Sequence, residues 1–199
     1  DESISLLKKV INGLNIYLPT DKEATKKTTK LASACSNYIG YCKDRGMNFD
    51  DISTLKYLVS GYRLDYDLSD YEINSIHKIF ETYENDLKKS NAFDFGDLLV
   101  WPYKYLTDPA HKNVLEAYQR RFVHILVDEF QDTNQVQYDL VILLSEKNNL
   151  FVVGDPDQTI YTWRGADIGI ILNFDQVFEG CKTISLEQNY RSSGNILRI

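Results

Sequence analysis

Two adjacent acidic residues, Asp128 and Glu129, directly follow an apolar run over residues 122–127 that contains β-branched side chains. Such a run predicts a buried strand, which would deliver both carboxylates to one edge of a sheet. There, one carboxylate can hold Mg²⁺, usually through water, and the next can orient or deprotonate an attacking water. Strands that end in acids are also common without any catalytic role. The amide, acid and hydroxyl side chains of residues 130–134, FQDTN, favour the functional interpretation.

A second polar cluster follows the next apolar run, residues 150–153, and has the sequence GDPDQ over residues 154–158. Glycine and proline give the chain a sharp exit from the predicted strand. Gln158 carries an uncharged donor and an uncharged acceptor, with which a side chain can report whether a γ-phosphate is present. The cluster therefore predicts a second set of polar groups at a strand end.

Three larger side chains come shortly after this cluster. Tyr161 and Trp163 could stack on nucleic-acid bases, and Arg164 could meet a phosphate or a carboxylate. Both aromatic residues could instead be core or interface residues, and the spacing alone leaves the two interpretations open.

A third apolar run, residues 182–186, predicts a strand. It ends just before the polar segment EQNYR, residues 187–191, which contains Arg191. An arginine at a strand end in such a sheet can reach a transferring phosphoryl group. A surface salt bridge is the alternative for a single arginine.

Helices are predicted between these strands. Asp108-Pro109 is a favourable start for a helix that ends near Arg121, and a second helix is predicted over residues 135–147. Strands that alternate with helices imply parallel pairing through helical crossovers. The carboxyl ends of parallel strands meet at one edge, where open α/β sheets place their ligands, so the three clusters are predicted to converge.

The first ninety residues read as amphipathic helices instead. Apolar residues keep helical spacing over residues 4–14, over residues 31–42, where Gly46 then ends the pattern, and over residues 73–87. Capping boxes are predicted at Thr20–Glu23 and Ser69–Glu72, and a short helix after Asp50 or Asp51. The sequence thus predicts an all-α subdomain over residues 1–92 and an α/β unit over residues 93–199.

Composition limits the classes of protein that fit. Among 199 residues, 43% are hydrophobic and 26% are charged, which is typical of a globular chain. The net charge of −7 argues mildly against binding nucleic acid by charge alone, so stacking would have to contribute to any DNA binding. No apolar run approaches the roughly 18 residues that a membrane-spanning helix needs. The three cysteines form no CxxC pair, which fits a reducing compartment and an intracellular protein.

Together, the three clusters resemble a known family. LVDEFQDTN (residues 126–134), VVGDPDQTIYTWRGA (residues 152–166) and LEQNYRSS (residues 186–193) resemble motifs II, III and IV of UvrD/Rep/PcrA-type superfamily 1 DNA helicases. FDFGDLL (residues 93–99) is similar to a further signature of that family, at the return from an inserted helical subdomain. The resemblance by motif covers residues 93–198, whereas residues 1–92 match only in position and helical character.

The resemblance implies roles for individual residues. Asp128 would coordinate Mg²⁺ through water, and Glu129 would activate the hydrolytic water. Gln158 would sense the γ-phosphate of ATP and link it to the DNA site, and Arg191 would stabilise the transition-state charge.

The same resemblance implies that Tyr161 and Trp163 contact single-stranded DNA, with Trp163 the better candidate for stacking. Arg164 would tie this DNA-contacting segment to the nucleotide site. Thr162 stands where many relatives carry arginine, which puts one cationic contact in doubt. His124, just inside the predicted strand, is interpreted as a packing residue.

A phosphate-binding loop of the form GxxxxGK[ST] does not occur in these 199 residues. The family has this loop upstream of the helical insertion, so the resemblance implies subdomain 1B followed by the C-terminal part of subdomain 1A. The expected fold is α/β: a partial RecA-like P-loop NTPase sheet, parallel with helical crossovers, preceded by the all-α subdomain. We expect the chain alone to bind ATP and Mg²⁺ poorly and to be inactive.

The function implied is that of an ATP-dependent DNA helicase that translocates on single-stranded DNA and unwinds duplexes at single-strand/double-strand junctions, from 3′ to 5′, in DNA repair or replication. Its partners would be DNA and the rest of the helicase chain (the P-loop part of 1A, and 2A/2B), in the cytoplasm or nucleoid if bacterial. Two alternatives remain: the motor of a RecB/AddA-type helicase–nuclease, and a non-catalytic module that binds DNA or a partner. A degenerate, non-catalytic module is disfavoured because the motif residues Asp128, Glu129, Gln158 and Arg191 are all present.

Overall fold

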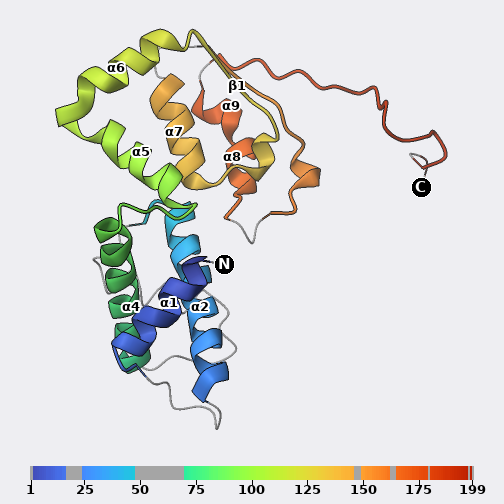
Figure 1. Cartoon of the computed structure of the whole chain (residues 1–199). Coiled ribbons are helices and arrows are strands. Elements are labelled where there is room, and N and C mark those ends of the chain that lie inside the picture. Colours follow the sequence, from blue (N-terminus) through green and yellow to red (C-terminus); the bar gives the residue numbers. More distant parts are fainter. Residues whose placement is uncertain are drawn as a thin grey trace.

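The structure, a computed structural model, describes residues 2–16, 24–47, 70–145, 149–161, 165–178, 180–196 and 198. Within these residues it consists of helices and a two-stranded parallel sheet (Figure 1). None of the described helices has both the length and the apolar character required to cross a bilayer.

Three helices form a bundle at the N-terminal side of the chain: α1 (Glu2–Gly13), α2 (Ala24–Asp44) and α4 (Asp70–Lys89) (Figure 1). Their apolar stripes face one another and form the main hydrophobic core, to which Leu7, Ile11, Ile39, Ile79, Phe80 and Tyr83 contribute buried side chains. The helical spacing predicted from the sequence is confirmed in this region.

Two details of the bundle agree with its helical sequence pattern. Cys35 and Cys42 lie buried on one face of α2, where burial raises the pKa of the Cys35 thiol to about 12 and that of Cys42 to about 11. Gly46 follows the end of α2 with a φ of 60°, a left-handed conformation that glycine adopts at little cost. The Thr20–Glu23 and Ser69–Glu72 capping boxes and the short helix after Asp50 lie outside the described residues.

Lys43 joins the bundle to the next helix, α5 (Asp97–Thr107). Its side chain is 1% exposed, and its Nζ lies 2.7 Å from Glu84 Oε1, 2.8 Å from Asp94 Oδ2 and 2.7 Å from Asp97 Oδ1. Burial opposes the charge, but the hydrogen bonds from the ammonium to these three carboxylates outweigh it and raise the pKa of Lys43. A Cβ on Gly96 would lie 2.7 Å from Lys43 Cδ, so glycine leaves the space that the lysine stem occupies.

The remaining elements are short helical turns, helices and the two strands. In chain order they are η1 (Pro109–His111), α6 (Lys112–Arg121), β1 (His124–Val127), η2 (Phe130–Asp132), α7 (Gln135–Ser145), β2 (Asn149–Val152), η3 (Pro156–Gln158), α8 (Ile168–Leu172) and α9 (Phe174–Val177). The predicted helix over residues 109–121 begins as a 3₁₀ turn, and Asp108 caps it by accepting the N–H of Ala110 at 2.8 Å.

Strands β1 and β2 pair in parallel, with His124 opposite Asn149 and Val127 opposite Val152, and α7 makes the crossover between them. The parallel pairing predicted from the sequence is therefore confirmed. The prediction that the strand before Asp128 is buried is wrong, because Leu126 is 71% exposed and His124 is exposed rather than packed. Phe151, which lies opposite Leu126 on β2, is 57% exposed. Nothing in the described part of the chain covers that side of the strand pair.

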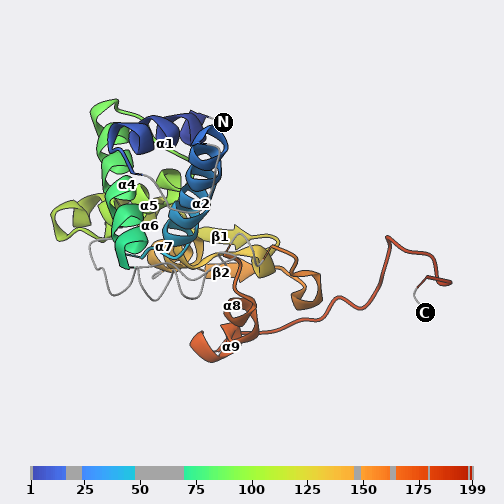
Figure 2. The ribbon, with the colours of Figure 1, turned by 90° about the horizontal axis from the view of Figure 1, so that it is seen from below.

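The third predicted strand does not form. Residues 182–186 pair with no strand in the described part of the chain and belong to an exposed, extended tail that leaves the other elements in both views (Figures 1 and 2). A strand is stabilised by the ladder to its neighbour and by burial of one face, and here Leu186 is 85% exposed. The sheet therefore has two strands where the sequence predicted three.

Candidate functional site

Asp128 and Glu129 lie at the carboxyl end of β1, and both are exposed. Glu129 adopts a left-handed conformation, with φ 50° and ψ 42°, which is uncommon for residues other than glycine and persists where neighbouring contacts fix it. Phe130 fixes this turn, since its side chain is fully buried and its N–H donates to the Val153 carbonyl at 2.9 Å. Glu129 N–H donates in turn to Asp128 Oδ1 at 2.9 Å.

A buried glutamine connects this turn to the segment that follows β2. Gln131 Nε2 donates to Glu129 Oε2 at 2.7 Å, and Gln131 Oε1 accepts the N–H of Asp155 at 3.0 Å. The side chain of Gln131 is almost completely buried. The two strand ends are thus joined by a side chain as well as by the backbone.

Gln158 belongs to the same network. Asp155 caps η3 by accepting the N–H of Asp157 at 3.0 Å with one carboxylate oxygen, and its other oxygen accepts Gln158 Nε2 at 2.7 Å. The structure therefore links Glu129, with Asp128 beside it, to Gln158 through Gln131 and Asp155, at one edge of the sheet.

The segment beyond Gln158 returns to the same turn. Ala166 forms an isolated antiparallel bridge with Asn134, and Asp167 N–H donates to the Thr133 carbonyl at 3.3 Å. Asn134 Nδ2 also donates to Asp44 Oδ1 at 3.0 Å, at the end of α2. The segment is therefore attached at Ala166 and Asp167 to the residues that follow the acid pair.

The predicted DNA-contacting residues lie in this segment. Tyr161 is at the border between partly and fully exposed, with 36% of its surface accessible. Thr162, Trp163 and Arg164 lie outside the described residues, so the positions predicted for these side chains stay predictions.

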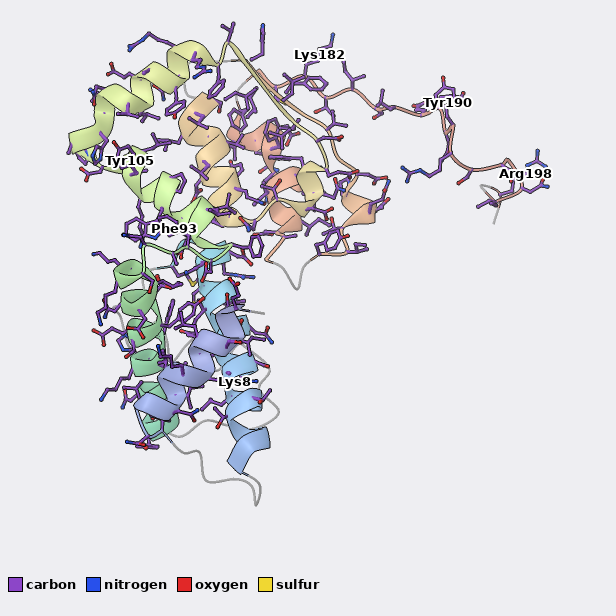
Figure 3. The ribbon with its side chains drawn as sticks, in the orientation of Figure 1. Lys8, Phe93, Tyr105, Lys182, Tyr190 and Arg198 are labelled. Carbon is purple, nitrogen blue, oxygen red and sulfur yellow. The ribbon has the colours of Figure 1, made fainter. Side chains whose placement is uncertain are left out.

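Arg191 is not brought to the acid pair. It is exposed on the extended tail, where its backbone N–H donates to Asn189 Oδ1 at 2.9 Å. Figure 3 shows the neighbouring Tyr190, and Arg198 beyond it, on the part of the tail that extends away from the helices and strands. Because residues 182–186 pair with no strand among the described residues, no ladder there fixes Arg191 relative to the sheet, and its role stays a prediction.

A cation could be held by few groups in the described residues. One set of three clustered carboxylates, from Glu84, Asp94 and Asp97, has suitable geometry, but the ammonium of Lys43 already contacts all three. At the sheet edge, Asp128 offers a single exposed carboxylate, whose oxygen chemistry suits Mg²⁺ when a bound phosphate supplies further ligands.

Sequence reasoning missed Gln131, Asp155 and Lys43. Gln131 and Asp155 lie inside the motifs, but their partners are 24 residues apart in the chain, and Lys43 meets Asp94 and Asp97 across 51 and 54 residues. The residue type of Gln131 could have indicated this role. A neutral amide next to an acid pair can both accept from a backbone N–H and donate to a carboxylate.

The parallel strand pair with polar side chains at its carboxyl edge agrees with the motif resemblance, and comparison with known proteins identifies the family. Residues 1–179 match the family model described as the UvrD/REP helicase N-terminal domain, so the chain belongs to this family.

Individual relatives agree with this assignment. The chain is 45% identical over 122 residues to a probable DNA helicase II homolog of Mycoplasma capricolum, an alignment that covers 61% of this chain and 17% of the relative. It is 46% identical over 130 residues to the ATP-dependent DNA helicase PcrA of Staphylococcus epidermidis, covering 65% of this chain and 18% of the relative. The PcrA of Staphylococcus aureus gives the same identity and coverage. The aligned part thus spans less than a fifth of each relative.

Proposed function

We propose that this chain is part of the motor of an ATP-dependent DNA helicase, which couples ATP hydrolysis to movement along single-stranded DNA and to duplex unwinding. The observation that carries the proposal is the hydrogen-bonded network at the carboxyl edge of the strand pair, which connects Glu129 to Gln158. Family membership and relatives named as DNA helicases support the same function.

In this proposal, residues 1–92 are the helical 1B-like subdomain and residues 93–199 the C-terminal part of a RecA-like 1A subdomain. The Lys43 cluster supports a junction near residue 92, because Lys43 and Glu84 come from the bundle whereas Asp94 and Asp97 begin the next unit. The open face at Leu126 and Phe151 fits a parallel sheet that further elements of a helicase would cover, since such sheets are normally covered on both faces.

The acid pair would serve ATP hydrolysis. Asp128 would hold Mg²⁺ through water, and the ion when bound would neutralise charge on the phosphates. Glu129 would accept a proton from the attacking water with the carboxylate oxygen that Gln131 does not occupy. Gln158 would contact the γ-phosphate, and Arg191 would approach the transferring phosphoryl group once the tail is held against the sheet.

The segment between Gln158 and Ala166 would contact DNA. Tyr161 and Trp163 would stack on bases, so that DNA binding relies on aromatic faces rather than on net positive charge. Arg164 would connect this segment to the nucleotide site. We propose 3′ to 5′ translocation, at single-strand/double-strand junctions, in DNA repair or replication inside the cell.

The 199 residues by themselves would be inactive. They contain no GxxxxGK[ST] sequence, whose backbone N–H groups and lysine bind the phosphates in P-loop enzymes. Without such a loop, the acid pair would face the triphosphate with no compensating cation, so ATP and Mg²⁺ would bind poorly.

Replacement of Glu129 by glutamine tests the proposed function in a helicase that contains this chain. E129Q should reduce ATP turnover by about 10²- to 10⁴-fold, the usual contribution of general-base catalysis, and should leave nucleotide binding intact. Phosphate release and titration with a fluorescent nucleotide measure the two quantities separately. Near-normal turnover by E129Q would show that Glu129 is not the base.

A further inference from the structure

The side chain of Gln131 has one hydrogen-bonding arrangement. The N–H of Asp155 can only donate, so it must face Gln131 Oε1, at 3.0 Å. The ionised Glu129 carboxylate can only accept, so it must face Gln131 Nε2, at 2.7 Å. The amide orientation is therefore determined by its partners, and reversing it would break both hydrogen bonds.

The surrounding backbone leaves space for this arrangement and for little else. A Cβ on Gly154 would lie 2.6 Å from Gln131 Oε1 and 2.8 Å from Ile171 Cδ1, so any larger residue there would displace the amide. Gln131 is only 1% exposed, so water cannot readily replace a lost partner. The left-handed turn at Glu129 directs its carboxylate to the same amide.

We propose that Gln131 is a positioning residue that fixes the Glu129 carboxylate relative to the segment 155–158, so that the position of Gln158 controls whether Glu129 is held ready to accept a proton. This rests on the proposed function. Gln131 acts through Glu129 Oε2, to which it donates, and leaves the other carboxylate oxygen for water.

The network can transmit a movement of Gln158 to Glu129 through Asp155 and Gln131. When Gln158 moves with its ligand, Asp155 moves with it, because Asp155 Oδ2 accepts Gln158 Nε2 at 2.7 Å. Displacement of the Asp155 N–H removes the donor to Gln131 Oε1, and the amide then loses the position from which it donates to Glu129. ATP hydrolysis would thereby depend on the conformation of the segment that leads into the DNA-contacting residues.

Two substitutions in a helicase that contains this chain test the proposal. Q131M keeps the size of the side chain and removes both hydrogen bonds, and should lower kcat for ATP by about 10- to 100-fold, the usual scale for a misplaced catalytic group, with KM little changed. It should also reduce the stimulation of turnover by single-stranded DNA. Q131E keeps an acceptor for the Asp155 N–H but has no donor for Glu129, so kcat should fall by a similar factor with KM again little changed.

Gln119 provides the matched control. It is also buried, and its Nε2 donates to the Leu143 carbonyl at 2.8 Å, away from the sheet edge. Q119M should reduce thermal stability, while kcat, its pH profile and the stimulation by DNA should stay as in the wild type. A purely structural role for Gln131 would make Q131M behave like Q119M.

The outcomes separate failure of this proposal from failure of the proposed function. Turnover by E129Q in the same preparation would overturn the base assignment itself. If E129Q is inactive while Q131M and Q131E retain wild-type kcat and stimulation by DNA, the positioning role is wrong. Should Q131M fail to fold, Q131E decides alone, since wild-type kcat and stimulation by DNA in that variant contradict the proposal.

Discussion

Replacing Lys43 by methionine should destabilise the chain strongly, because it leaves three carboxylates without their cation. Methionine keeps the packing of the lysine stem between α2 and Gly96 and removes only the ammonium. That ammonium lies within 2.8 Å of one oxygen on each of Glu84, Asp94 and Asp97.

The solvent exposure of the three carboxylates determines how much free energy of unfolding K43M should lose. The side chain of Asp97 is 3% exposed and that of Asp94 is 13% exposed, whereas Glu84 at 29% can recover part of its hydration from water. The loss therefore falls mainly on the two aspartates. Removing one partner of a buried ion pair typically costs about 3–5 kcal/mol, and we expect K43M to lower the free energy of unfolding by an amount in this range.

Urea unfolding followed by far-UV circular dichroism measures this quantity, and Lys89 provides the control. Lys89 is 77% exposed and contacts Asp86 at 3.5 Å, so K89M should change the free energy of unfolding by less than about 1 kcal/mol. Adding Asp94→Asn and Asp97→Asn to K43M should restore part of the loss, because the uncompensated charges are then removed. A K43M value no larger than that of K89M would refute this account of the junction.

Three further outcomes are expected. Burial outweighs the hydrogen bond from Lys43 and raises the pKa of Glu84 above its ordinary 4.5, so the folded state binds this proton more tightly and loses stability as pH rises through the raised value. E84Q should therefore gain stability relative to the wild type as pH rises above about 4.5, the ordinary pKa of a glutamate, and a difference that does not change with pH would contradict this. Trp163→Ala in a helicase that contains this chain should weaken single-stranded DNA binding by roughly 1–3 kcal/mol, measured by titrating a labelled oligonucleotide, and unchanged affinity would favour a packing role. Isothermal titration of the 199-residue chain with Mg-ATP, with a parallel phosphate-release assay, should detect neither micromolar binding nor steady turnover, and either would show that the nucleotide site is misplaced.

Local patterns predicted much of the fold. The spacing of Leu7 and Ile11, of Cys35 and Cys42, and of Ile76 and Phe80 indicates helices whose apolar faces become the core. The apolar runs before Asp128 and before Gly154 were correctly predicted as parallel strands. These features depend on short-range periodicity, which a single sequence displays directly.

Features that depend on distant partners could not be predicted in the same way. Residues 182–186 have the composition of a strand, but a strand also needs a neighbour, and the described residues supply none. Likewise, Lys43 looks like an ordinary helix-surface lysine until the fold brings Asp94 and Asp97 to it. At the candidate site, the location of Asp128, Glu129 and Gln158 at the sheet edge could be predicted because each follows a predicted strand. The bridging role of Gln131 became evident only from its burial and its contact with Asp155 in the structure.

A strand-displacement assay tests the central claim most directly. A helicase that contains this chain should separate a partial duplex with a 3′ single-stranded tail when Mg-ATP is present, and should leave a matched duplex with a 5′ tail intact. E129Q should bind the same DNA without separating it. Displacement that proceeds without ATP, or that E129Q performs as well as the wild type, would contradict the account of this chain as part of an ATP-driven motor.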